Sequence, residues 1–236
     1  MKKNITILLM MAVVAVSGCS TIKTNELTLM EAQQLNDKSL AYTKYNRLQD
    51  FPAQTAVTVQ FGLLGVSSAI SSGNTMMRNN KITDPALDIA QALAKKLSDK
   101  HKVKVVQNEQ VIPLNSDVKS IVSQYPGSDY ILDVKTANWS SIYFPSDWNN
   151  YRIIYNGHAR LIDTSSQTVI AEVLCTSNPE FKNTDLAPSY EALESGVGIR
   201  SELAKAIDFC VDYIISEANI NGDKKVTNAI AGNDNG

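Results

Sequence analysis

The sequence has no excess of charge of one sign. Its 236 residues contain 22 Lys and Arg and 24 Asp and Glu, which gives a formal net charge of -2 at pH 7. Proteins that hold nucleic acids through phosphate groups need a basic surface, and this balance provides none. We therefore expect no nucleic-acid partner.

Residues typical of catalytic and metal sites are scarce. There are two histidines, His101 and His158, and three cysteines. No cysteine has a second Cys or a His at the spacing of metal ligands. His158 could approach Asp133 on a neighbouring strand, but no serine lies in a nucleophile-elbow sequence, so a hydrogen-bonded histidine on a strand surface is the simpler interpretation. We expect no enzymatic activity, no cofactor and no metal.

Carboxylate pairs do not change this expectation. A glycosidase needs two acids that face each other across a cleft. The first pair in this sequence belongs to a helix start, the last faces solvent, and a salt bridge to Lys135 or Arg160 accounts for Asp133. The pairs are Asp84 with Asp88, Asp129 with Asp133, and Asp208 with Asp212.

Long apolar runs are missing except at the amino terminus. Two lysines precede an apolar stretch over residues 5–16, which is shorter than the roughly 20 residues of a membrane span. The stretch ends in Val16-Ser17-Gly18-Cys19, with small residues directly before a cysteine. We interpret residues 1–18 as a secretory signal and Cys19 as a lipid-attachment residue. An ordinary signal with a coincidental cysteine is the alternative.

This segment resembles the bacterial lipoprotein signal. The resemblance implies cleavage before Cys19, a thioether lipid on that cysteine, and an acyl chain such as palmitate on the new amino terminus. Ser20, in place of Asp, implies transport to the outer membrane, with the anchored domain facing the periplasm. Removal of Lys2 and Lys3 leaves 20 basic residues against 24 acidic ones, so the mature charge is about -4.

Cys175 and Cys210 remain as a pair in an oxidising compartment, where thiols tend to form disulfides. Alternation along residues 168–176 points Cys175 inward, and the apolar side of the last helix includes Cys210. We predict a disulfide between them. Two buried, unpaired thiols are the alternative.

The periodicity of apolar residues predicts a single α/β domain over residues 51–218. Its elements follow the order β-α-β-α-β-β-β-α, with a mixed sheet of about five strands and three helices packed against it. Asp84 and Pro85 mark the start of the first helix, and the polar residues 164–167 indicate a hairpin turn. The expected strands cover residues 57–61, 103–106, 130–136, 151–163 and 168–176, and the expected helices 85–101, 116–125 and 202–217.

Three segments lack a clear period. Residues 19–50 are polar and predict a tether between the lipid and the domain. Residues 62–81, rich in Gly, Ser and Asn, predict a long loop. Residues 219–236 predict a disordered tail.

The order of elements over residues 55–217 on a lipidated periplasmic chain resembles one group of lipoproteins. The group includes the curli secretion-channel lipoprotein and the lipoprotein activators of peptidoglycan synthases. A second resemblance, to small proteobacterial lipoproteins, implies the same kind of module, which faces the periplasm and serves binding or assembly without a catalytic motif. It is carried by Cys175, Tyr190-Glu191-Ala192-Leu193, Leu203-Ala204-Lys205-Ala206 and Cys210.

An aromatic stretch is the candidate partner-binding site. Both tryptophans of the chain lie within it, in a connection that is otherwise polar. Large rings contribute much contact area at little entropic cost. Alternatively, the rings fold back and cover the sheet, and in either case we expect Trp148 to be more exposed than Tyr155. The candidate residues are Trp139, Tyr143, Phe144, Trp148 and Tyr151.

These observations predict a lipid-anchored, non-enzymatic binding module of the cell envelope. Its partner would be an envelope protein or a peptidoglycan-associated component. The alternative is a subunit that oligomerises within an envelope assembly or secretion complex.

Overall fold

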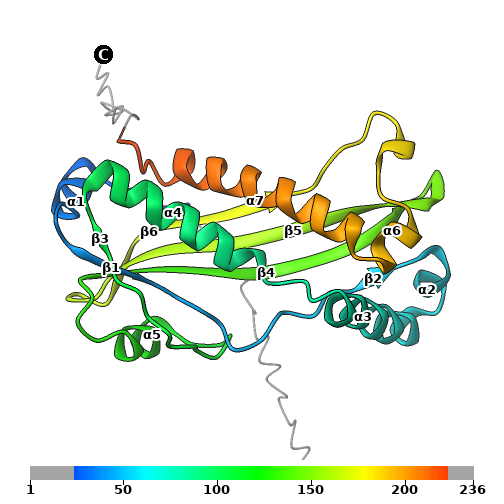
Figure 1. Ribbon diagram of the computed structural model, residues 1–236, viewed down its shortest axis with the longest axis horizontal. Helices are drawn as coiled ribbons and strands as arrows, with labels where there is room; N and C mark the ends of the chain where they lie inside the picture. The colour runs from blue at the N-terminus through cyan, green and yellow to red at the C-terminus, as the bar shows by residue number, and fades with distance from the viewer. Residues whose placement is uncertain (1–23, 223–236) are drawn as a thin grey trace, which may run out of the picture.

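A long hairpin forms the centre of the fold. The computed structural model describes residues 24–222, and β4 (Tyr130–Phe144) and β5 (Asp147–Asp163) are the longest strands in that part of the chain (Figure 1). β5 continues through a turn into β6 (Thr168–Ser177), and the three strands pair antiparallel. The predicted turn at residues 164–167 is confirmed.

Parallel strands complete the sheet on the free side of β4. The first half of β4 pairs with β1 (Ser39–Tyr42), and the second half pairs with β2 (Ala53–Gln54). β3 (Lys104–Val105) lies outside β1, so the order is β3-β1-β4-β5-β6. The prediction of an α/β fold with a mixed sheet is confirmed, with six strands rather than about five.

Two long helices cover one face of this sheet. α4 (Pro85–His101) and α7 (Val197–Glu217) lie side by side along the hairpin (Figure 1). Asp84 caps α4 through the Ala86 N–H, with Pro85 in the first turn, as predicted. Apolar side chains from both helices and from the sheet form the main core between them. Its central members include Ile89, Leu93, Leu97, Leu132, Val134, Leu161, Val173, Leu203, Ala206 and Ile214.

A smaller core lies on the opposite face, at the end of the sheet where β1 begins. α5 (Val118–Gln124) packs Ile121 there against Ile131 and Ile162. The helix expected over residues 116–125 begins slightly later. Asp117 caps α5 by accepting from the Ser120 N–H. The rest of this face carries the polar side of the hairpin.

The prediction of a polar tether over residues 19–50 is wrong for the described part of that range. α1 (Leu29–Gln34) and β1 belong to the fold, and Leu27, Leu35 and Leu40 are fully buried. These three leucines are scattered in the sequence, yet all three enter the main core, whereas Leu29 and Met30 stay exposed. The domain therefore begins close to Cys19, which itself lies outside the described residues.

A strand over residues 57–61 and a loop over residues 62–81 were also wrong predictions. Both segments are helical, as α2 (Ala56–Gln60) and α3 (Gly62–Asn79). Thr55 starts α2 as its N-cap and accepts from the Thr58 N–H. The alternating valines of residues 57–59 face solvent, so their period reflects no buried strand face.

The connection expected between residues 136 and 151 is wrong as well, because β4 and β5 run through it. A register shift between Thr136 and Asn138 changes which side chains face inward. Only residues 145 and 146 connect the two strands. The expected tail begins later than residue 219, since Asn219 and Ile220 are buried. Residues 223–236 lie outside the described part.

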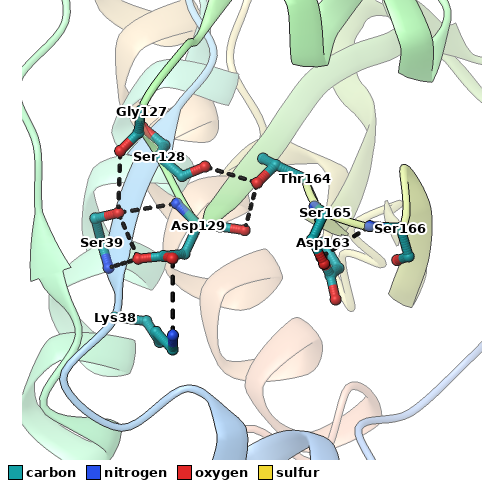
Figure 2. A network of polar contacts seen from close by, with 9 residues as sticks. All are labelled: Lys38, Ser39, Gly127, Ser128, Asp129, Asp163, Thr164, Ser165 and Ser166. Atoms are coloured by element: carbon teal, nitrogen blue, oxygen red, sulfur yellow. Dashed lines mark hydrogen bonds and ion pairs between the residues drawn. The ribbon is translucent and has the colours of Figure 1, made fainter.

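Polar contacts fix the end of the sheet that lies opposite the turn at residues 145 and 146 (Figure 2). The Asp129 carboxylate accepts from the backbone N–H and the hydroxyl of Ser39, at 2.8 and 2.7 Å. Thr164 donates to the backbone oxygens of Ser128 and Asp129. The hydrogen bonds from Ser39 hold the pKa of Asp129 below its usual value. These contacts join the ends of β1, β4 and β5, so Asp129 has a structural role.

Gly73 provides a test of the α3 packing. A Cβ added there would lie 1.7 Å from the Phe51 backbone oxygen, so Gly73→Ala must push the helix away from the β2 segment. We expect the free energy of unfolding in urea to fall by at least about 2 kcal/mol. Ser72→Ala, at the exposed neighbouring position, should change it by less than about 0.5 kcal/mol. Equal stabilities of the two variants would contradict this packing.

Candidate functional site

The turn end of the hairpin projects beyond its neighbour strand. β6 pairs with β5 only as far as Tyr155, which faces Ser177. Beyond that point β5 has one isolated bridge, between Asn150 and Ser189. Asp147 stiffens the turn by accepting from the Asn150 amide at 2.7 Å and from the Asn149 N–H at 3.1 Å. The hydrogen bond from Asn150 lowers the pKa of Asp147.

Two of the predicted binding residues belong to the core. Trp139 is fully buried, donates its indole N–H to the Gln49 oxygen at 3.0 Å, and meets the Phe51 ring edge-on. Tyr151 is buried against Tyr190. The register shift in β4 points Trp139 inward, opposite Tyr155. The prediction that Trp139 and Tyr151 bind a partner is therefore wrong.

The other three predicted residues lie at the projecting end. Trp148 is 61% exposed, whereas Tyr155 is fully buried, which confirms the expected order of exposure. Phe144 and Tyr143 are half-buried. Tyr143 packs against the main core, while the Phe144 ring meets the Phe181 ring edge-on at 5.8 Å. A partner for these residues remains a prediction.

The segment between β6 and α6 (Tyr190–Glu194) adds residues that the sequence did not indicate. Leu186, in the short 3-10 helix η1 (Thr184–Leu186), is 72% exposed, and Phe181 covers Phe144. This segment has no regular period. The bridge between Ser189 and Asn150, the hydrogen bond from the Tyr151 N–H to the Pro188 oxygen and the Phe181–Phe144 contact hold it against the hairpin. No pattern in the sequence identifies these contacts.

Arg152 supplies a cation at the same end. Its guanidinium carbon lies 5.8 Å from the centre of the Phe144 ring, within cation–π range. Its Nε is buried and has no hydrogen-bond partner within residues 24–222, and no carboxylate in that range forms a salt bridge with it. A half-buried cation beside aromatic rings suits contact with a group that has a polar or acidic edge. Phe144, Trp148, Arg152, Phe181 and Leu186 together form what we call the hairpin-end surface.

The groups considered for catalysis are held in separate pairs. Asp133 is fully buried and accepts from Arg160 at 2.6 and 2.9 Å and from Thr43 at 3.0 Å. Of Lys135 and Arg160, the two predicted salt-bridge partners of Asp133, Arg160 is the one that forms the bridge. Tyr45 also donates to Asp133, and burial followed by the Asp133 charge raises the pKa of Tyr45.

His158 pairs with a different acid. It is buried, and its Nε2 lies 2.7 Å from Glu172. Burial lowers the pKa of His158 despite the hydrogen bond to Glu172. His101 bonds the Ile220 oxygen. Within residues 24–222, none of these groups has a hydrogen bond to a serine, and no cluster of His, Cys, Asp and Glu is arranged to hold a metal.

The disulfide prediction is confirmed. Cys175 of β6 and Cys210 of α7 are bonded, with their Cα atoms 5.6 Å apart. The bond joins the sheet to the helix layer. Cys19, the predicted lipidation residue, lies outside the described residues.

A second exposed apolar surface lies beside the hairpin end. Leu63 and Leu64, at the start of α3, are 87% and 80% exposed. Further large apolar side chains of this helix pair also face solvent. We call the exposed set Val57, Val59, Phe61, Leu63, Leu64 and Val66 the α2–α3 ridge.

Comparison with known proteins gives no family. No protein-family model and no curated protein matches the sequence. In the part of the chain that the structure describes, no helix has the length and apolarity of a membrane span.

Some solved structures are similar at low identity. PelC from Paraburkholderia phytofirmans, a dodecamer, is 12% identical over 84% of this chain and 96% of its own, with a TM-score of 0.34. Lipoprotein GNA1162 from Neisseria meningitidis is 14% identical over 71% and 99%, with a TM-score of 0.35. Protein XCC0632 from Xanthomonas campestris is 11% identical over 86% and 97%, with a TM-score of 0.36. At these scores none of them supports a functional argument for this chain.

The pH dependence of stability tests the environment of His158. Because its pKa is lower in the folded state than its unfolded value of 6.5, the unfolded chain binds this proton more readily. The neutral His158 side chain contributes fully to the free energy of unfolding above pH 6.5. This contribution is lost as the pH falls through 6.5 toward the pKa of the folded state.

The variant His158→Gln keeps a hydrogen-bond donor for Glu172 but cannot titrate. Between pH 7.5 and 5.5, the unfolding free energy of the wild type should fall by up to about 1 kcal/mol more than that of the variant. Urea denaturation at several pH values measures both. Parallel pH profiles of the wild type and the variant would contradict a lowered pKa of His158 in the folded state.

Proposed function

We propose that this protein is a lipid-anchored lipoprotein of the bacterial cell envelope, acylated at Cys19. Support comes from the basic start, the short apolar run and the Val16-Ser17-Gly18-Cys19 ending. Ser20 supports attachment to the outer membrane, with the domain facing the periplasm. The disulfide between Cys175 and Cys210 suits an oxidising compartment.

The domain is proposed to be a non-enzymatic binding module for another envelope component. The observation that carries this proposal is the hairpin-end surface, where Trp148 and Leu186 are exposed beside the half-buried Arg152. Tryptophan and arginine are enriched at binding hot spots, and Leu186 adds exposed apolar area at the same end of the hairpin. A non-enzymatic role is supported by the separate pairing of Asp133 with Arg160 and of His158 with Glu172.

The partner is proposed to be an envelope protein or a peptidoglycan-associated component. Self-association through the same surface, within an envelope assembly, is the alternative. Oligomerisation would leave the hairpin end contacting another copy of the chain. The two proposals differ in what the surface captures.

A crosslinking experiment in intact cells tests the surface. The double variant Trp148→Ala, Leu186→Ala should lose at least 10-fold in capture of its main envelope partner, because alanine removes most of the apolar contact area. The matched control is Phe209→Ala, Tyr213→Ala, which removes an exposed stacked pair on α7. The control should capture the partner as the wild type does.

Each result assigns the role of the surface. A captured copy of the same chain, lost in the hairpin-end variant, would favour the oligomeric alternative. Equal capture by both variants at equal abundance would contradict the proposed binding surface.

A further inference from the structure

The α2–α3 ridge is apolar, exposed and free of charge. No residue from Phe51 to Met77 is charged, and the nearest acids in the sequence are Asp50 and Asp84. Isolated exposed apolar residues are ordinary, but a concentrated group marks a contact surface. Leu63 and Leu64 are the most exposed of its side chains.

The packing of α3 carries the ridge away from the helix layer. At its end, the Asn80 amide donates to the Glu194 oxygen beside α6, and Arg200 of α7 donates to the Asn80 oxygen. In the middle of α3, Gly73 lies against the backbone of Phe51 at the sheet edge. From these points α3 runs back toward α2, the helix with which its first turns pack.

The amino-terminal half of α3 is covered on its inner side by α2 and leaves its outer side exposed. Its buried Gly65 packs against Thr58 of α2 rather than against the sheet. Leu63 lies ten residues before Gly73, which corresponds to about 15 Å along the helix axis. The most exposed part of the α2–α3 ridge thus lies about 15 Å along α3 from the contact of Gly73 with the Phe51 backbone.

The amino-terminal segment joins the sheet at its other edge. Asn25 exchanges backbone hydrogen bonds with Glu172 of β6 at 2.8 and 2.9 Å, which fixes where the domain begins. Six peptide steps join Asn25 to Cys19, and a chain spans at most about 3.6 Å per residue. Cys19 can therefore lie no more than about 22 Å from the β6 edge, which is the edge of the sheet opposite β2.

We propose that the α2–α3 ridge inserts into the interfacial layer of the bilayer that holds the lipid on Cys19. The inference rests on the proposed lipid anchor. A ridge of leucine, valine and phenylalanine without charge suits the boundary between headgroups and acyl chains. The anchor keeps the ridge at high effective concentration beside that layer, so insertion becomes an intramolecular step. The two contacts would give the domain a fixed orientation on the membrane.

Fluorescence quenching by lipid tests the proposal. Full-length protein purified from membranes is reconstituted into phosphatidylethanolamine and phosphatidylglycerol vesicles whose acyl chains are brominated. The variant Leu63→Trp places a tryptophan on the ridge, and Phe209→Trp places one at an exposed position on α7. The native Trp139 and Trp148 contribute equally to both samples. The emission that the new tryptophan adds to that of the wild type is compared with and without bromine. For Leu63→Trp, bromination should remove at least half of this added emission, and for Phe209→Trp it should leave the added emission unchanged.

Other outcomes overturn the proposal. Equal quenching of both variants, or none at residue 63, would show that the ridge does not enter the bilayer preferentially. Flotation of the wild-type protein with the vesicles distinguishes failure of the proposed lipid anchor from failure of the proposed ridge insertion. If the protein floats but residue 63 is not quenched, the ridge proposal fails and the anchor stands. If the wild type does not float, both fail.

Discussion

The pairing of β4 with β5 is the interaction on which the rest of the structure depends. β4 supports β1 and β2 along one side, and β5 supports β6 along the other. The inward face of these strands supplies the surface on which α4 and α7 pack. Because the hairpin is longer than its neighbours, one end projects, and Trp148 and Leu186 are exposed there instead of being covered. The same ladder that builds the core thus also presents the candidate surface.

The Asp133 carboxylate in the sheet is paired, whereas Arg152 at the projecting end forms no salt bridge within residues 24–222. Asp133 is compensated by Arg160, Thr43 and Tyr45 within the fold. Breaking such a buried pair is strongly destabilising, because it leaves one charge unpaired. Arg152, by contrast, lies over the face of Phe144, and its buried Nε has no hydrogen-bond partner within residues 24–222. This contrast supports a division between a rigid core with structural polar pairs and an end that is open to a partner.

Local signals made part of the fold predictable. Asp84 and Pro85 start α4, the polar residues 164–167 form a turn, and the inward positions of Cys175 and Cys210 predicted their disulfide correctly. The wrong predictions concern segments whose structure depends on tertiary contacts. The four residues of β1 are too short to show a period, and only parallel pairing with β4 makes them a strand. In α3, glycine and serine suggested a loop, although Gly73 permits close helix packing. Trp139 faces the core because of a register shift that no local sequence pattern predicts.

The proposed lipid anchor connects the sequence to the proposed role, because an acylated Cys19 would stand only six residues before Asn25 and would hold the domain at the membrane surface. Mass spectrometry of the amino-terminal peptide, from protein purified out of bacterial membranes, measures this directly. The account predicts a peptide that begins at Cys19 and carries a thioether-linked lipid and an amide-linked acyl chain, with Cys19→Ala abolishing both lipidation and membrane retention. An amino terminus elsewhere, or an unmodified Cys19 thiol, would contradict the account.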